Sequence, residues 1–188
     1  GSCGVTVEDL QTIDNGKGQW LGYTQLIRGR KTTELLESVI TDALAGLPIR
    51  KRMRWSDHDF EFVRPVHWLA AVYGNATVEL EIMNIRSGNV SHGHRFHAGQ
   101  AIVIDTAARY AGIMRDSGKV IVDFAERRNE ILRQAEQQAA TINGVICNNP
   151  RLLDEITGLV EWPVALAASF DTSFLELPRE VLIATMEK

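Results

Sequence analysis

Apolar residues recur at steps of three and four along two stretches of the chain. One stretch ends before Gly46, and the longer one follows Gly118 and ends before Asn143-Gly144. This spacing places apolar side chains on one face of an α-helix, so each stretch predicts an amphipathic helix. In the longer stretch Asp123 precedes Arg127 by four residues, which is the spacing of a weak ion pair on a helix surface.

Shorter helices are predicted by the residues that start them. Pro150 and Pro178 each precede apolar residues, and proline fits the first turn of a helix because its missing N–H would be unpaired there. Asp105 or Thr106 can cap a further helix that runs toward Arg115. The later part of the chain is therefore expected to be mostly helical.

The remaining pattern is that of β-strands. Apolar and polar residues alternate over residues 78–82, behind a turn at Gly74-Asn75. Further short strands are expected at Trp20 to Ile27, Ile102 to Ile104 and Val164 to Ala168. Strands in the middle of the chain would pack with several amphipathic helices. We expect a single α+β domain over residues 1–188, with a more helical C-terminal portion over about 106–188.

The composition is that of a soluble globular protein, and it narrows the classes of partner. The 188 residues are 45% hydrophobic and 23% charged, with a formal net charge of −4. A nucleic-acid-binding surface would therefore have to be a local basic patch. No apolar run approaches the roughly 20 residues of a membrane-spanning helix and no export signal is seen, so no membrane partner is expected. Cys3 and Cys147 lack the spacing of a disulfide framework or zinc site, which favours a cytoplasmic location.

The clearest basic patch is the segment from residue 50 to residue 55, here termed the basic segment. It carries four positive charges without an acidic residue among them, followed directly by a tryptophan. Cations neutralise phosphates and an indole can stack on an unpaired base, so this segment is the candidate RNA contact. The candidate residues are Arg50, Lys51, Arg52, Arg54 and Trp55. The alternative is a solvated basic loop, or an arginine paired with Asp57 or Asp59.

Three histidines, His92, His94 and His97, have the spacing H-x-H-x-x-H. Imidazoles bind zinc when a fold brings them together, but no nearby cysteine completes a familiar zinc pattern. On a strand, His92 and His94 would share one face and His97 would lie opposite. We therefore expect packed or hydrogen-bonded histidines and no metal site.

Six segments together carry a resemblance to a known family. They are KRMRW at 51–55, FVRPVHWL at 62–69, GHRFH at 93–97, GKVIVDFAERR at 118–128, LVEWPVAL at 159–166 and LPREVLIATM at 177–186. In this order and spacing they resemble the beta subunit of the bacterial heterotetrameric glycyl-tRNA synthetase. The resemblance covers nearly the whole chain, with a departure at His92, where arginine is usual in the family.

The resemblance implies a place in glycine–tRNA ligase, which attaches glycine to its tRNA at the expense of ATP. In that family the alpha subunit holds the ATP and glycine site, and the beta subunit is associated with tRNA recognition. The chain is expected to be a fragment from the N-terminal part of a beta subunit, with both of its ends as fragment boundaries. It would hold no cofactor itself, because ATP and Mg are expected at the alpha-subunit active site. The expected partners are the alpha subunit, the remaining beta-subunit domains and tRNA(Gly).

Two roles are open for the chain within such a ligase. The preferred one is noncatalytic: positioning tRNA or organising subunits and domains. The alternative is a hydrolytic editing domain acting on mischarged tRNA, since a weaker fold-level analogy links the chain to the editing-type domain of the phenylalanyl-tRNA synthetase beta subunit. Ser56, Asp57 and His58 are adjacent, but adjacency in sequence does not supply the geometry of a triad, so no catalytic residue is assigned.

Overall fold

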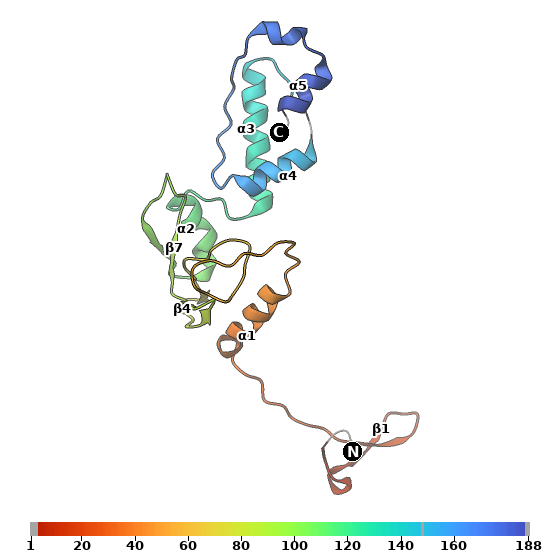
Figure 1. Cartoon of the computed structure of the whole chain (residues 1–188). Helices are drawn as coiled ribbons and strands as arrows, with labels where there is room; N and C mark the ends of the chain where they lie inside the picture. The colour runs from red at the N-terminus through yellow and green to blue at the C-terminus, as the bar shows by residue number, and fades with distance from the viewer. Residues whose placement is uncertain (1–3, 148, 187–188) are drawn as a thin grey trace. The chain divides into compact units, whose positions relative to one another are not determined.

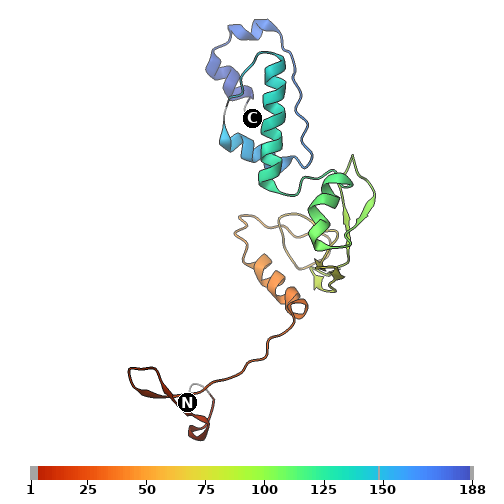
Figure 2. The ribbon, with the colours of Figure 1, turned by 180° about the vertical axis from the view of Figure 1, so that it is seen from behind.

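The computed structural model of the chain describes residues 4–147 and 149–186. Backbone contacts divide the chain into two compact units, residues 1–36 and 37–188. Helices and antiparallel strand pairs both occur, so the predicted α+β class is confirmed (Figures 1 and 2). The single domain expected over residues 1–188 stays a prediction.

The first unit contains one short hairpin. The 3-10 helix η1 (Val7–Asp9) precedes strand β1 (Gln11–Asp14), which pairs antiparallel with β2 (Gln19–Gly22). The strand predicted over Trp20 to Ile27 is therefore confirmed only as far as Gly22. Every residue of β1 is exposed, so the hairpin contributes no buried core.

Helix α1 (Thr32–Ala45) confirms the first amphipathic helix predicted from the sequence. It runs from the first unit into the second. The N–H of Gly46 donates to the carbonyl of Asp42 at 3.0 Å and closes its last turn. The helix thus ends directly before Gly46, as the sequence predicts.

Three successive hairpins form the strand region of the second unit. They are β3 (Val72–Tyr73) with β4 (Ala76–Thr77), β5 (Glu81–Ile82) with β6 (Ile85–Arg86), and β7 (Val90–His92) with β8 (Ala101–Val103). Gly74, in the two-residue turn between β3 and β4, has a φ of 64° that glycine adopts without strain. Ser87 links neighbouring hairpins, because its N–H donates to the Leu80 carbonyl at 2.9 Å and its hydroxyl donates to the Val78 carbonyl at 2.6 Å.

Apart from Pro163, the buried apolar side chains of the described residues all lie between positions 78 and 121. They are Val78, Leu80, Ile82, Ile102, Ile104, Met114 and Ile121. Ile102 and Ile104 pack with Met114 of helix α2 (Tyr110–Asp116). The strand predicted over residues 78–82 is confirmed only at Glu81–Ile82, although burial alternates over the whole stretch, with Glu79 and Glu81 exposed between the buried residues.

Helices account for most of the regular structure after residue 106. The 3-10 helix η2 (Ala107–Arg109) leads into α2, with Thr106 at the cap position as one of the two predicted candidates. Helix α4 (Pro150–Leu159) begins at the predicted proline, and α5 (Arg179–Met186) begins directly after Pro178. The 3-10 helix η3 (Thr172–Glu176) lies between them.

The longest helix, α3 (Phe124–Thr141), starts later than a helix directly after Gly118 would. Asp123 is its N-cap, and its carboxylate accepts a hydrogen bond from the N–H of Glu126 at 2.7 Å. The predicted ion pair of Asp123 with Arg127 is wrong, because the Arg127 guanidinium donates instead to the backbone carbonyls of Thr157 and Ile121. A capping bond and a contact distant in sequence thus replace the local pair.

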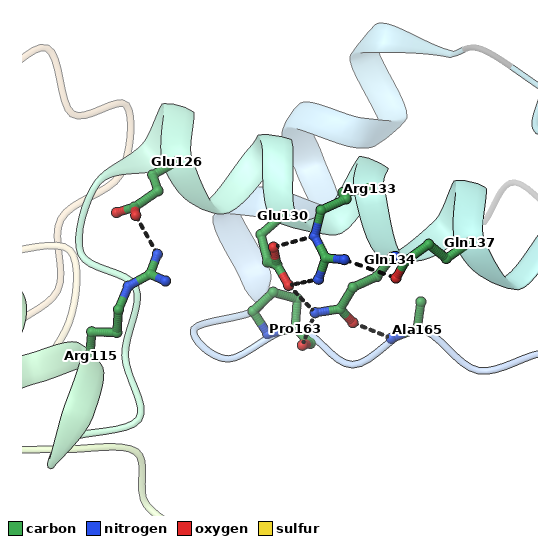
Figure 3. A network of polar contacts seen from close by, with 8 residues as sticks. All are labelled: Arg115, Glu126, Glu130, Arg133, Gln134, Gln137, Pro163 and Ala165. Carbon is green, nitrogen blue, oxygen red and sulfur yellow. Dashed lines mark hydrogen bonds and ion pairs between the residues drawn. The ribbon is translucent and has the colours of Figure 1, made fainter.

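The segment after α4 contradicts another prediction. Val164 to Ala168 is not a strand. The side-chain amide of Gln134 on α3 donates to the Pro163 carbonyl at 3.1 Å and accepts from the Ala165 N–H at 2.9 Å (Figure 3). A helix side chain therefore supplies the hydrogen bonds that a neighbouring strand would otherwise supply.

Glu130 lies at the centre of the same network (Figure 3). Its carboxylate accepts hydrogen bonds from Arg133 at 2.8 and 2.6 Å and from Gln134 at 2.6 Å. The bonds from Arg133, followed by the bond from Gln134, lower the pKa of Glu130 from 4.5 to about 2. The carboxylate therefore stays ionised far below the pH at which an isolated glutamate takes up a proton.

We expect Glu130→Gln to lower the free energy of unfolding by about 1 kcal/mol at neutral pH. A carboxyl with a lowered folded-state pKa stabilises the fold above its ordinary pKa, and this contribution is lost as the pH falls from 4.5 through about 2. The difference in melting temperature between wild type and variant should therefore shrink over this range. Glu136→Gln, on the same helix and outside this network, is the control. If the difference in melting temperature stays constant down to pH 2, the pKa of Glu130 is not lowered by these hydrogen bonds.

Two further expectations concern the cysteines and the membrane. Cys147 is exposed and free, whereas Cys3 lies outside the described residues. None of the helices formed by residues 4–147 and 149–186 is long and apolar enough to cross a membrane.

Candidate nucleic-acid interface

The basic segment follows α1 and is held by a short backbone pairing. The N–H of Met53 donates to the Phe62 carbonyl at 2.9 Å, and the N–H of Phe62 donates to the Met53 carbonyl at 3.1 Å. These two bonds fix the middle of the segment against the chain that returns at residues 60–62. The charged side chains on either side of Met53 are therefore placed by a defined backbone.

Arg52 is engaged with the end of α1. Its guanidinium donates to three backbone carbonyls, those of Leu44 at 3.5 Å, Ala45 at 3.1 Å and Leu47 at 3.4 Å. The last carbonyls of a helix have no partner within the helix, and a cation also stabilises the negative end of the helix dipole. Arg52 therefore caps α1, a role that its place in a run of cations does not reveal.

Arg54 and Trp55 also contact protein groups. The Arg54 guanidinium lies 4.0 Å from the Asp59 carboxylate and 3.9 Å from the Glu61 carboxylate. The expected alternative of an arginine paired with Asp59 is thus observed, with Glu61 as a second partner. Trp55 is half-buried and packs edge-to-face on Phe60, with ring centroids 4.9 Å apart.

Arg50 and Lys51 differ from the other cations of the basic segment. Both are exposed, and within the described part of the chain neither forms an ion pair. They are the two charges of the segment that a phosphate could approach without displacing a protein carboxylate or carbonyl. The structure thus ranks them first among the five candidate RNA contacts, whose role in binding stays a prediction.

Ser56, Asp57 and His58 do not form a catalytic triad. The Ser56 hydroxyl donates to the Asp57 carboxylate at 3.0 Å, and His58 Nδ1 lies 4.0 Å from the same oxygen. The Ser56 hydroxyl is the main cause that lowers the pKa of Asp57 below its ordinary value. In a triad the imidazole lies between hydroxyl and carboxylate, whereas here the carboxylate lies between the other two. This order cannot activate the serine as a nucleophile.

The three histidines lie in two separate contacts. His92 ends β7 and packs edge-to-face on Trp68, with ring centroids 4.6 Å apart. The rings of His94 and His97 are 4.5 Å apart, and His94 Nδ1 accepts a hydrogen bond from the Phe96 N–H at 3.2 Å. Among residues 4–147 and 149–186, no group of three His, Cys, Asp or Glu side chains is placed to hold a metal ion. The expectation that the chain has no metal site stays a prediction.

Phe96 is an exposed aromatic residue that the motifs of the sequence do not identify as a surface feature. Its side chain is 85% exposed in the loop between β7 and β8. A signal was present, because residues 83–104 contain no aspartate or glutamate in a chain whose net charge is −4. This loop is therefore a second exposed surface that lacks acidic residues, besides the basic segment.

Comparison with known proteins identifies the family. The chain matches the family described as "Glycyl-tRNA synthetase beta subunit" over residues 1–188. It is 43% identical over 191 residues to the glycine–tRNA ligase beta subunit of Marinobacter nauticus, covering 100% of this chain and 27% of that relative. It is 46% identical over 185 residues to the glycine–tRNA ligase beta subunit of Ectopseudomonas mendocina, covering 98% of this chain and 26% of that relative.

These matches place the chain among proteins of aminoacyl-tRNA synthetases. It belongs to the glycyl-tRNA synthetase beta-subunit family, as the six sequence segments predict. The chain spans about a quarter of the length of the curated relatives that it matches.

Proposed function

We propose that the chain acts within glycine–tRNA ligase by positioning tRNA(Gly) or by organising subunits and domains, without carrying out the chemistry. The observation that carries the proposal is the family match over residues 1–188. Its partners would be an alpha subunit, the remaining beta-subunit domains and tRNA(Gly) in the cytoplasm. ATP and Mg would bind at the alpha-subunit active site.

The geometry supports a binding role for the chain. Arg50 and Lys51 are exposed cations without a carboxylate partner in the described part of the chain, as phosphate contacts require. The alternative is a hydrolytic editing domain with a fold similar to that of the phenylalanyl-tRNA synthetase beta subunit. The arrangement of Ser56, Asp57 and His58 speaks against these residues as a hydrolytic site.

The proposal is tested by reversing two charges in the assembled ligase. Arg50→Glu combined with Lys51→Glu should weaken tRNA(Gly) binding. The slope of the logarithm of the binding constant against the logarithm of the salt concentration should also become less negative, by about 1 for each phosphate contact that is lost. Glycine-dependent pyrophosphate exchange should be unchanged, because glycine activation involves no tRNA phosphate. Binding is measured at several salt concentrations, with the 188-residue chain alone as a negative control for exchange.

The control variant carries the same change of net charge elsewhere. Arg28→Glu with Lys31→Glu alters two exposed cations outside the basic segment and should retain the wild-type salt slope. Arg52 is left unchanged, since its replacement would remove the cap of α1. If the two variants have equal tRNA affinity and an equal salt slope, the basic segment is not a tRNA contact. Glycine-dependent pyrophosphate exchange by the chain alone would refute the noncatalytic role.

A further inference from the structure

The loop between β7 and β8 is hydrogen-bonded to the residues that follow α2. The N–H of His94 donates to the Gly118 carbonyl at 2.7 Å. The His94 carbonyl in turn accepts from the N–H groups of His97 at 3.2 Å and Ala98 at 2.8 Å. Gly93 lies so close to Gly118 that a Cβ at position 93 would be 2.4 Å from its carbonyl oxygen. The backbone that carries residues 94–97 is therefore held by several contacts.

The side chains of this loop present an aromatic ring beside cationic and imidazole groups. Phe96 is 85% exposed, and the Arg95 guanidinium lies 5.9 Å from the centroid of its ring. The His94 ring lies 6.1 Å from the Phe96 ring and 4.5 Å from the His97 ring. The hydrogen bond from the Phe96 N–H to His94 Nδ1 fixes the backbone at the base of the aromatic side chain.

Neither the loop nor the groove beside it contains an unpaired carboxylate. Residues 83–104 contain no aspartate or glutamate. An open groove beside the loop is lined by His97, Gln100, Asp105 and Arg109, among other residues. The Asp105 carboxylate forms an ion pair with Arg109. Arg95 forms no ion pair with any residue of the described ranges and stays available to an anion.

We propose that residues 94–97 bind an unpaired RNA nucleotide, with the base stacked on Phe96 and Arg95 at a neighbouring phosphate. Exposed aromatic rings next to cations recognise single-stranded RNA in this way, because every base offers a stacking face and every linkage a charge. The proposal rests on the proposed function, since tRNA(Gly) would supply the nucleotide.

The composition of the loop favours RNA over a protein partner. An aromatic anchor of a protein–protein interface lies in a well-packed apolar centre from which water is excluded. Apart from Phe96, residues 92–100 contain no apolar side chain larger than that of Ala98. The ring lies instead beside the His94 imidazole and the Arg95 guanidinium, which suit a base and its sugar-phosphate backbone.

Substitutions at Phe96 separate stacking from simple apolar contact. Phe96→Leu keeps an apolar side chain but removes the π-face, so binding of the chain to single-stranded RNA and to tRNA(Gly) should weaken by about 5- to 150-fold. Phe96→Trp keeps the π-face and should bind as wild type does. Phe170→Leu is the matched control, because Phe170 is 58% exposed but stands next to Asp171. Binding is measured by the fluorescence anisotropy of labelled RNA, with a fully paired RNA duplex as the comparison probe.

Each outcome of this experiment decides the proposal. Loss of binding in Phe96→Leu alone, with single-stranded RNA preferred over duplex, supports it. Unchanged binding in Phe96→Leu overturns it, and so does an equal loss in Phe170→Leu. If Phe96→Leu binds normally while the Arg50 and Lys51 double variant is weakened, this loop site is wrong and the proposed function stands. If the wild-type chain and the wild-type ligase bind neither single-stranded RNA nor tRNA(Gly), the loop site fails together with the tRNA-positioning role, and only the organising role stands.

Discussion

Replacing Gly93 by alanine is expected to lower the free energy of unfolding by about 2–4 kcal/mol. A Cβ at this position would lie 2.4 Å from the Gly118 carbonyl oxygen, 2.6 Å from the Gly118 Cα and 2.8 Å from the Ala98 Cβ. Two of these atoms are backbone atoms, so no side-chain rotation relieves the clash. The loop would have to move away from α2 and lose the 2.7 Å hydrogen bond from His94 to Gly118.

Urea unfolding of the chain measures this effect against a control in the same loop. A Cβ at Gly99 would meet no atom within 4 Å, so Gly99→Ala should change stability by less than about 0.5 kcal/mol. If both variants unfold at the same urea concentration, the close approach of Gly93 to Gly118 does not exist in solution. The Gly93→Ala variant should also lose affinity for single-stranded RNA if residues 94–97 form the proposed site.

Replacing Arg127 by methionine is expected to cost about 2–4 kcal/mol of stability. Arg127 Nε donates to the Thr157 carbonyl at 3.0 Å, and its Nη1 donates to the Ile121 carbonyl. Thr157 lies in the last turn of α4 and is fully buried, so its carbonyl has neither a helix partner nor water to replace the guanidinium. Methionine keeps an apolar stem of similar length but leaves both carbonyls without this donor.

Thermal melting of Arg127→Met should be compared with that of Arg128→Met. Arg128, the next residue on α3, forms a partly exposed ion pair with Asp154 at 2.6 Å. Such a pair contributes at most about 1 kcal/mol, so the control should melt close to wild type. Equal melting temperatures for the two variants would mean that Arg127 does not stabilise the contact between α3 and the end of α4.

Elements decided by neighbours in sequence were predictable, and those decided by distant partners were not. The spacing of apolar residues predicts α1, and the two prolines predict the starts of α4 and α5, because these signals act within one or two helical turns. Val164 to Ala168 has the composition of a strand, but its hydrogen bonds come from Gln134, about thirty residues earlier. Arg127 is bonded to Thr157, which is 30 residues away.

Some features of the candidate site could be predicted from the sequence and others could not. The run of cations at residues 50–54 is visible in the sequence, and the exposure of Arg50 and Lys51 agrees with a solvent-facing role. The capping of α1 by Arg52 is not visible, because it depends on where the helix ends relative to the guanidinium. The exposure of Phe96 likewise follows from the pinned loop, since a phenylalanine beside histidines is as easily buried as exposed.

The position of the buried aliphatic residues has a consequence for synthesis on the ribosome. These side chains lie between Val78 and Ile121, on three hairpins that follow one another directly along the chain, on the segments beside the hairpins and on helix α2. Closing such short loops costs little entropy, and folds rich in contacts near in sequence form quickly. Once Ile121 has left the exit tunnel, every side chain of this cluster is present, although α3, α4 and α5 are still to be translated. The cluster can therefore form during translation, before the later helices have been synthesised.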